Sequence, residues 1–288
     1  FRIPPLFDHH SHFSLYSVLS ATPSLENVTR PRDAYRIIQK SADKPITIIT
    51  GWNSSCYNLT PGDLGESHPV IVLNLSLHGM VINKPAEEYL APEYNDFVLN
   101  RLDPAWTEKN LPGILAMIVR LAPVPDDTLS SFAMHLESSG IAAIDDMLLP
   151  GPGWLDRTRA LPVTVGYWAD RNVYEALPPA EKKKVKGVKF FTDGALGTRT
   201  AALTRPYLSG GKGMLLFTDE ELKAGLYEYM RDGIPAAVHA IGDRAVDQAV
   251  KTVHLLRRER GCNGPVRIEH AQFISGEAAR MARNAGII

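Results

Sequence analysis

Histidines near the start of the chain are spaced for metal binding. His10 and His12 lie in Asp8–His12, directly after a short apolar run. In an extended chain, side chains two residues apart point to the same side, so both imidazoles can reach one ion. Neutral imidazole is the commonest nitrogen ligand of zinc. The pattern indicates a metal site, and a solvated polar turn is the alternative.

The same placement recurs twice later in the chain. His239 ends the apolar segment 235–239, and His270 ends the segment 266–270. In a parallel barrel the carboxyl ends of all strands meet on one face, where active sites form. We therefore expect His10, His12, His239 and His270 to converge. Each could separately be a capped or packed core histidine, but three strand ends that all carry histidine favour a shared site.

A lysine lies inside an apolar strand. Lys189 is the centre of Gly187–Phe191, which would bury it, and a buried lysine is costly unless it is paired or chemically altered. Carboxylation would turn this cation into an anionic oxygen ligand able to bridge two metal ions. The alternative is an ion pair with Asp193 or Glu269. Spacing alone leaves both interpretations open.

The elements that must position these residues form a strand–helix alternation. Several apolar runs lack polar alternation, as is typical of strands covered on both faces. The predicted strands are Pro5–Phe7, Ile46–Thr50, Val70–Leu75, Ile141–Asp145, Val163–Tyr167, Val188–Phe191, Ala236–Val238 and Val266–Ile268. The predicted helices are Asp126–Ser139, Thr218–Asp232, Ala245–Gly261 and one that opens at Ser275. This succession predicts βαβ units, a parallel sheet and an α/β fold.

One segment does not follow this alternation. Residues 13–124 are rich in Pro and Asn and carry isolated strand signals, so we expect an insertion or a small subdomain there. Residues 1–12 and 125–288 would form the barrel. Asp243 precedes the helix after His239, and we expect it to be the N-cap.

Composition excludes several classes of protein. The chain has 288 residues, 44% of them hydrophobic, and a formal net charge of -1, which argues against a strongly basic nucleic-acid or membrane-surface binder. No apolar stretch approaches the roughly 18 residues of a membrane span. Two cysteines cannot form a disulfide framework, so we expect a cytoplasmic protein.

Four stretches together resemble the amidohydrolase superfamily, specifically its family 3, the YtcJ-like predicted metal-dependent hydrolases. They are Asp8–His12, Gly187–Ala201, Val238–Val246 and Arg267–Gln272, with weaker matches at Gly51–Asn53 and His78–Asn83. The resemblance implies a (β/α)8 TIM barrel in which His10 and His12 end the first strand, Lys189 lies on the fourth, His239 on the fifth and His270 on the sixth. It implies one or two divalent metal ions, most often zinc, and a lysine that is often carboxylated.

The activity that the resemblance implies is hydrolysis of a carbon–nitrogen bond, amide-like but not peptide, in a small molecule by metal-activated water. The family's general base is an aspartate that ends the eighth strand, and we expect it beyond Ile288, in a longer chain than this one. The barrel would then be truncated before its last strands. The alternative is a catalytically silent fragment or metal-binding remnant without that aspartate.

Further residues are candidates for substrate binding. Trp52 and His78 lie in the expected insertion, and Asp193 follows the strand that holds Lys189. A packed tryptophan and a surface histidine are the alternatives for the first two. We expect a small-molecule substrate and neither nucleic acid nor membrane as a partner, and a homodimer is a common state of such enzymes.

Overall fold

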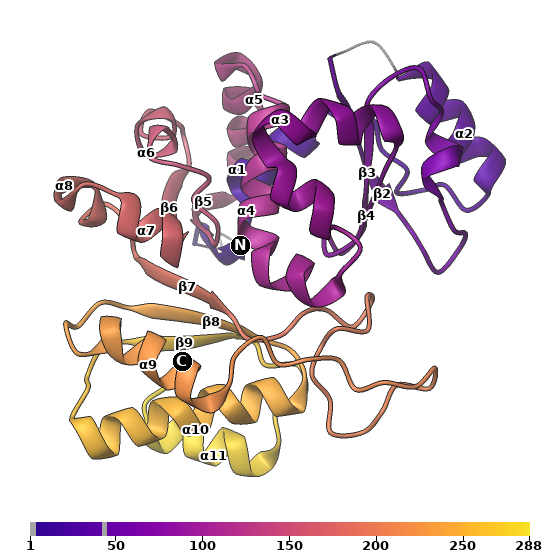
Figure 1. Cartoon of the computed structure of the whole chain (residues 1–288). Helices are drawn as coiled ribbons and strands as arrows, with labels where there is room; N and C mark the ends of the chain where they lie inside the picture. Colours follow the sequence, from indigo (N-terminus) through magenta and orange to yellow (C-terminus); the bar gives the residue numbers. More distant parts are fainter. Residues whose placement is uncertain (1–3, 42–44) are drawn as a thin grey trace. The chain divides into compact units, whose positions relative to one another are not determined.

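The computed structural model describes residues 4–41 and 45–288 (Figure 1). The chain divides into two compact units, which are described separately. Unit 1 contains the residues up to Ser14 together with Ser130–Ile288, and unit 2 is Leu15–Leu129. The boundaries of unit 2 differ from those of the expected insertion, 13–124, by two residues at the first boundary and by five at the second. Helices α1 (Phe13–Leu19) and α5 (Asp126–Ser138) run across the two boundaries, which explains the difference.

Unit 1 is built on a parallel six-stranded sheet of order β1-β5-β6-β7-β8-β9, which curves into a nearly closed barrel. Its strands are β1 (Leu6–Ser11), β5 (Ile141–Asp146), β6 (Thr164–Asp170), β7 (Gly187–Phe191), β8 (Ala236–Ala240) and β9 (Val266–His270). Side chains link the two outer strands, since the Arg267 guanidinium of β9 donates to the carbonyl oxygen of His9 on β1 at 2.7 Å.

Helices connect the later strands of unit 1, and their ends carry the signals that the sequence shows. The helices are α6 (Gly153–Arg157), α7 (Arg171–Ala176), α8 (Pro179–Lys182), α9 (Asp219–Met230), α10 (Asp243–Arg260) and α11 (Gly276–Asn284). Thr218 and Glu221 form a capping box on α9, Ser275 caps α11, and α10 ends at Gly261 in the left-handed region. In Figure 1, α9, α10 and α11 lie on one side of β8 and β9.

The core of unit 1 lies between these helices and the sheet. Apolar side chains of β7 and β8, among them Val188, Phe190 and Val238, pack against Leu226 of α9 and Val253 of α10. Small residues allow close approach of the strands. A Cβ on Gly187 would lie only 2.1 Å from the carbonyl oxygen of Pro235, so this position requires glycine.

Unit 2 contains a three-stranded sheet of its own, in which β2 (Thr47–Trp52) pairs parallel to β3 (Val70–Asn74) and β3 antiparallel to β4 (Met80–Ile82). Its other elements are α2 (Pro31–Lys40), η1 (Pro61–Leu64), α3 (Lys84–Asn100) and α4 (Pro104–Leu121). Apolar residues of β2, β3 and α2 form its core, including Ile49, Val72 and Ile38.

The eight strands expected from the sequence are all present, with shifted ends, and β4 was not predicted. The segment 13–124, expected to be an insertion or a small subdomain, contains helices that were not predicted from the sequence. Proline stands in the first turn of α2, α3 and α4, and Asn83 and Asp103 cap the last two. Proline and asparagine therefore mark helix starts here rather than loops.

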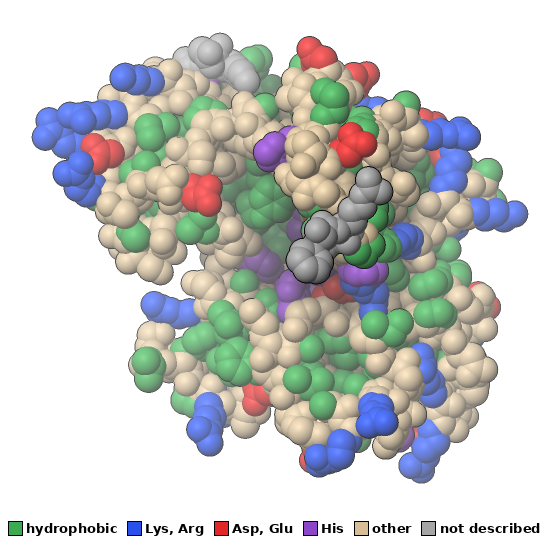
Figure 2. Space-filling model, turned by 180° about the vertical axis from the view of Figure 1, so that it is seen from behind, with side chains coloured by type: hydrophobic (Ala, Val, Ile, Leu, Met, Phe, Trp, Pro, Cys, Tyr) green, Lys and Arg blue, Asp and Glu red, His purple; other side chains and the backbone are tan. Residues whose placement is uncertain are grey.

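The N-cap expected at Asp243 is wrong. Gly242 occupies the cap, and Asp243 is the first helical residue, whose Oδ1 accepts a hydrogen bond from Thr204 N at 2.8 Å. Among the described residues, no helix is long and apolar enough to cross a membrane. Lys and Arg side chains on the face in Figure 2 are scattered among uncharged and acidic ones, and the described residues form no continuous basic surface there.

Candidate metal-binding site at the strand ends

Unit 1 brings four predicted histidines into contact. His10 is on β1 with His12 directly after it, and His239 and His270 are on the neighbouring strands β8 and β9. The ring centroids of His10 and His270 are 4.6 Å apart, those of His239 and His270 4.8 Å, and those of His10 and His12 5.7 Å. The four imidazoles thus form a continuous row at the carboxyl ends of the strands, although they are up to 260 positions apart.

Local backbone geometry sets the direction of the last member of the row. His270 has a φ of 68° and Ala271 a φ of 46°, both in the left-handed region that non-glycine residues seldom adopt. The amide of Ala271 donates to the carbonyl oxygen of Ala240 at 3.0 Å, which ties this turn to the end of β8. Such backbone strain persists where the surrounding structure imposes it, and it clusters at functional sites.

Lys189 is buried in unit 1, with 1% of its surface exposed. Its Nζ has no hydrogen-bond partner among the described residues, and neither Asp193 nor Glu269 forms an ion pair with it there. Burial lowers the pKa of Lys189 to about 7, although the negative charge of Glu269 opposes this shift. The ion-paired lysine that the sequence left open is therefore not what the structure shows.

A carboxylate orients His10. Glu269 lies on β9, with 5% of its side chain exposed, and its Oε2 is 2.5 Å from His10 Nδ1. Burial alone would raise the pKa of Glu269, but the hydrogen bond with His10 and the positive charges of Lys189 and Arg267 outweigh it and lower the pKa to about 2. A charged carboxylate on one ring nitrogen fixes the tautomer and leaves Nε2 of His10 as the nitrogen with metal-ligand character.

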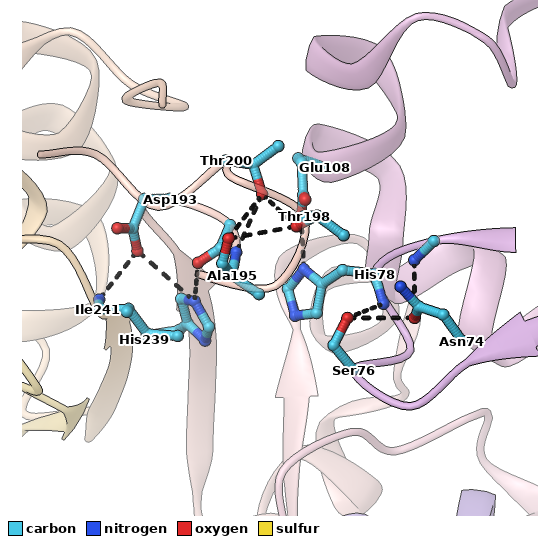
Figure 3. Close-up of polar contacts among 12 residues, drawn as sticks. Asn74, Ser76, His78, Glu108, Asp193, Ala195, Thr198, Thr200, His239 and Ile241 are labelled. Atoms are coloured by element: carbon cyan, nitrogen blue, oxygen red, sulfur yellow. Dashed lines mark hydrogen bonds and ion pairs between the residues drawn. The ribbon is translucent and has the colours of Figure 1, made fainter. Parts of the chain in front are cut away.

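Asp193 is fully buried in the loop after β7. Its carboxylate accepts hydrogen bonds from the backbone N–H groups of Ile241, Gly242 and Ala202 at 3.0, 2.8 and 2.9 Å. Figure 3 shows Asp193 directed toward both Ile241 and His239. The carboxylate predicted to bind substrate is thus engaged with the protein backbone on both oxygens.

The remaining predicted residues belong to unit 2. Trp52 packs against the core of that unit, and its Nε1 donates to the carbonyl oxygen of Tyr57 at 2.9 Å. His78 lies in the turn between β3 and β4, and its Nδ1 is 2.7 Å from Oε2 of Glu108, a buried residue of α4 (Figure 3). Both residues therefore belong to unit 2, whereas the four histidines of the row belong to unit 1.

Sequence reasoning missed Glu108 and the partnership of Glu269 with His10. Glu108 is 30 positions from His78 and Glu269 is 259 positions from His10, so no local pattern connects either pair. The one available signal is that Glu269 directly precedes His270 in a buried strand, where a carboxylate needs a partner.

The donors fit a divalent cation in kind, since imidazole nitrogen binds zinc and related ions. Two observations support this fit: the imidazoles touch one another, and the buried Nζ of Lys189 has no hydrogen-bond partner within the described residues. Their present placement is a row, however. Across residues 4–41 and 45–288, no three His, Cys, Asp or Glu side chains stand where they could hold one ion together.

Comparison with known proteins gives matches in sequence and in structure. Residues 151–288 match the sequence model of the amidohydrolase family. The chain is 36% identical over 100 residues to YtcJ of Bacillus subtilis (strain 168), a protein named as an amidohydrolase, and 32% identical over 101 residues to Protein LONG AFTER FAR-RED 3 of Arabidopsis thaliana. These segments cover 33% and 34% of this chain and 18% and 17% of the two relatives.

Two solved structures share the fold over nearly the whole chain. They are uncharacterised metal-dependent hydrolases of Pyrococcus horikoshii OT3, with a TM-score of 0.70 at 22% identity, and of Pyrococcus furiosus, with a TM-score of 0.64 at 23% identity. Each match covers 99% of this chain and 61% or 63% of the solved chain, so this chain corresponds to part of its relatives. The curved parallel sheet of unit 1 is a TIM-barrel arrangement, as the sequence predicted.

Proposed function

We propose that this chain carries the metal-binding strand ends of a metal-dependent hydrolase, because residues 151–288 match the sequence model of the amidohydrolase family. The observation that carries the proposal is the row of four imidazoles from three strands. The proposed reaction is hydrolysis of an amide-like carbon–nitrogen bond in a small molecule. Neither nucleic acid nor a membrane is a proposed partner.

We propose His10, His12, His239 and His270 as the nitrogen ligands and zinc as the metal. The rings already touch, so rotation of side chains on fixed strands is the movement that would turn the row into a site around one point. Lys189 is the proposed oxygen ligand after carboxylation, in which its neutral amine adds to carbon dioxide and releases one proton. Its support is the buried Nζ without a hydrogen-bond partner among the described residues, because a lone buried ammonium group is costly.

When bound, a divalent cation polarises a carbonyl group and lowers the pKa of water to about 7. The chain's own residues supply the framework for this chemistry. Glu269 holds Nδ1 of His10 and thereby presents Nε2, and Arg267 in turn donates to Glu269 Oε2 at 3.2 Å. This arrangement of ligand, carboxylate and guanidinium fixes the ring without occupying its second nitrogen.

Metal content tests the proposal directly. We expect the purified chain to hold one or two equivalents of zinc, and His10→Ala and His239→Ala to lose it. His135→Ala is the matched control, because this exposed histidine of α5 is outside the row. Folded protein without zinc, or equal zinc in all three variants, would contradict the proposal and favour a silent remnant.

His78 and Trp52 are kept as proposed substrate contacts, with unequal support. The indole of Trp52 is already used inside unit 2, whereas the imidazole of His78 is held by a buried glutamate, an arrangement that suits a group oriented for binding. Replacement of His78 by alanine is expected to raise KM more than it lowers kcat on any amide that the zinc-loaded chain hydrolyses. An unchanged KM would remove His78 from the site.

A further inference from the structure

Asp193 connects two strand ends in unit 1. Its Oδ1 accepts from Ile241 N at 3.0 Å, and its Oδ2 accepts from Gly242 N at 2.8 Å and Ala202 N at 2.9 Å. A backbone N–H can only donate, so both side-chain oxygens of Asp193 act as acceptors in these three bonds. Asp193 thus joins the loop after β7 to the residues that follow β8.

The backbones of these two segments are in direct contact. A Cβ on Gly242 would lie 2.0 Å from the carbonyl oxygen of Ala202, so only glycine allows this approach. The N–H of Arg244 donates to that same oxygen at 3.1 Å. With the Asp193 carboxylate between them, the segments form one rigid frame around the end of β8.

His239 is the side chain that this frame surrounds. Its Nε2 lies 3.2 Å from the carbonyl oxygen of Gly194 and 3.5 Å from Oδ1 of Asp193 (Figure 3). Both neighbours are acceptors, so Nε2 must carry the proton, and in a neutral imidazole Nδ1 then carries the lone pair. Thr192 fixes the backbone beneath the ring, since its N–H and Oγ1 both donate to the carbonyl oxygen of His239, at 3.0 and 2.6 Å.

We propose that Asp193 is a positioning residue that, with the carbonyl group of Gly194, holds His239 in the Nε2–H tautomer and so makes Nδ1 the nitrogen that His239 offers to a metal ion. This inference rests on the proposed function, because it concerns a ligand of the proposed metal. It also assigns Asp193 a role through His239 rather than through substrate, which agrees with the complete burial of its side chain.

The test uses the whole chain and needs no turnover. Nitrogen NMR of the metal-free protein, labelled at histidine, reports which ring nitrogen of His239 carries the proton at a pH where the ring is neutral. We expect the Nε2–H tautomer in the wild type and a mixture of tautomers in Asp193→Asn. Zinc affinity, measured by competition with a chelator, is expected to fall about 10- to 100-fold in that variant, as loss of an outer carboxylate partner usually causes.

Asp243→Asn is the matched control. This second carboxylate also holds the loop after β7, through Thr204 N, but it does not contact His239. We expect it to leave both the tautomer and the zinc affinity unchanged. Equal losses in the two variants would show a general loosening of the loop and overturn the inference.

The outcomes separate this inference from the proposed function. A wild-type His239 in the Nδ1–H tautomer overturns the inference even if Asp193→Asn does not fold. Zinc binding that Asp193→Asn leaves unchanged overturns it as well, while the proposed function stands. A wild type that binds no zinc overturns the proposed function, and with it the metal part of the inference, whatever the tautomer.

Discussion

At the scale of single residues, the proposed metal ligands of unit 1 and the side chains around them are held by partners distant in sequence. The sequence predicted that His10 and His12 lie close together, and their ring centroids are 5.7 Å apart, although His12 lies just past the end of β1. The contacts of His10 with Glu269 and of Asp193 with Ile241 and Gly242 were not predictable. They depend on how the strands align side by side, and no local pattern encodes that alignment.

A buried carboxyl group predicts how the stability of unit 1 depends on pH. Burial raises the pKa of Asp146 to about 7. Hydrogen bonds from Ser14 and from Leu148 N favour the ionised form and oppose this shift, but burial outweighs them. Tyr167 is the titratable neighbour. Between about pH 4 and pH 7 the folded state holds a proton that the unfolded state releases, so the free energy of unfolding falls as pH rises through this window and is constant above it.

The substitution Asp146→Asn is expected to abolish this pH-dependent fall in the free energy of unfolding. For the pKa shift of Asp146, the fall amounts to at most about 4 kcal/mol. Urea unfolding of both proteins at the two ends of the window measures it. An identical pH dependence in wild type and variant would show that Asp146 titrates normally in the folded chain.

Lys189→Met separates a structural role of this lysine from a metal-binding one. Methionine fills a similar volume without a charge, and removal of a buried cation that has no hydrogen-bond partner in the described part of the chain should not destabilise the fold. We expect the Tm of the metal-free protein to stay or rise, while zinc content falls. A loss of more than about 2 kcal/mol of stability would instead indicate a structural partner.

At the scale of elements, the strands of unit 1 could be predicted because each is a short apolar run, whereas the helices of unit 2 could not. Pro31, Pro85 and Pro104 begin helices, and the same residue type is equally typical of turns. Strand β4 is three residues long, too short for a periodic signal. The sequence therefore predicted elements that an apolar pattern defines. It did not predict those that begin with proline, because proline is typical of both helix starts and turns.

The contact between β7 and β8 gives a prediction about packing. Gly187→Ala would place a methyl group against the carbonyl oxygen of Pro235, so we expect the strands to separate locally and the free energy of unfolding to fall by about 1–3 kcal/mol. Gly151→Ala is the control, since no atom lies within 4 Å of a Cβ at that position. Chemical unfolding of the two variants measures the difference. Equal stabilities would show that the start of β7 accommodates the methyl group without loss of stability.

At the scale of the whole molecule, a ligand that binds only the folded chain must stabilise it. At free zinc about 100 times the dissociation constant, the gain is about 2.7 kcal/mol. At about 2–4 °C per kcal/mol for a domain of this size, this corresponds to a rise in Tm of about 5–10 °C. Calorimetry with zinc and with a chelator measures the shift. His239→Ala should remove it, and a shift that persists in that variant would indicate zinc bound elsewhere.

The discontinuity of unit 1 has a consequence for the order of folding. β1 pairs with β5 in a register that joins Leu6 to Ile141, and closing a flexible loop of that length costs about 4 kcal/mol of chain entropy. The chain leaves and re-enters unit 1 at neighbouring points, since the rings of Phe13 and Phe132 have centroids 5.6 Å apart. Once Leu15–Leu129 has folded by itself, most of that loop is already closed.

β1 is therefore expected to join the sheet after unit 2 has formed. Pulsed hydrogen exchange during refolding would detect protection of the β1 amides only in the later phase, and protection before that of β2 and β3 would contradict this order. During synthesis the same constraint applies: β1, the strand that carries His10, leaves the ribosome before β5 and must wait for a partner more than a hundred residues behind it.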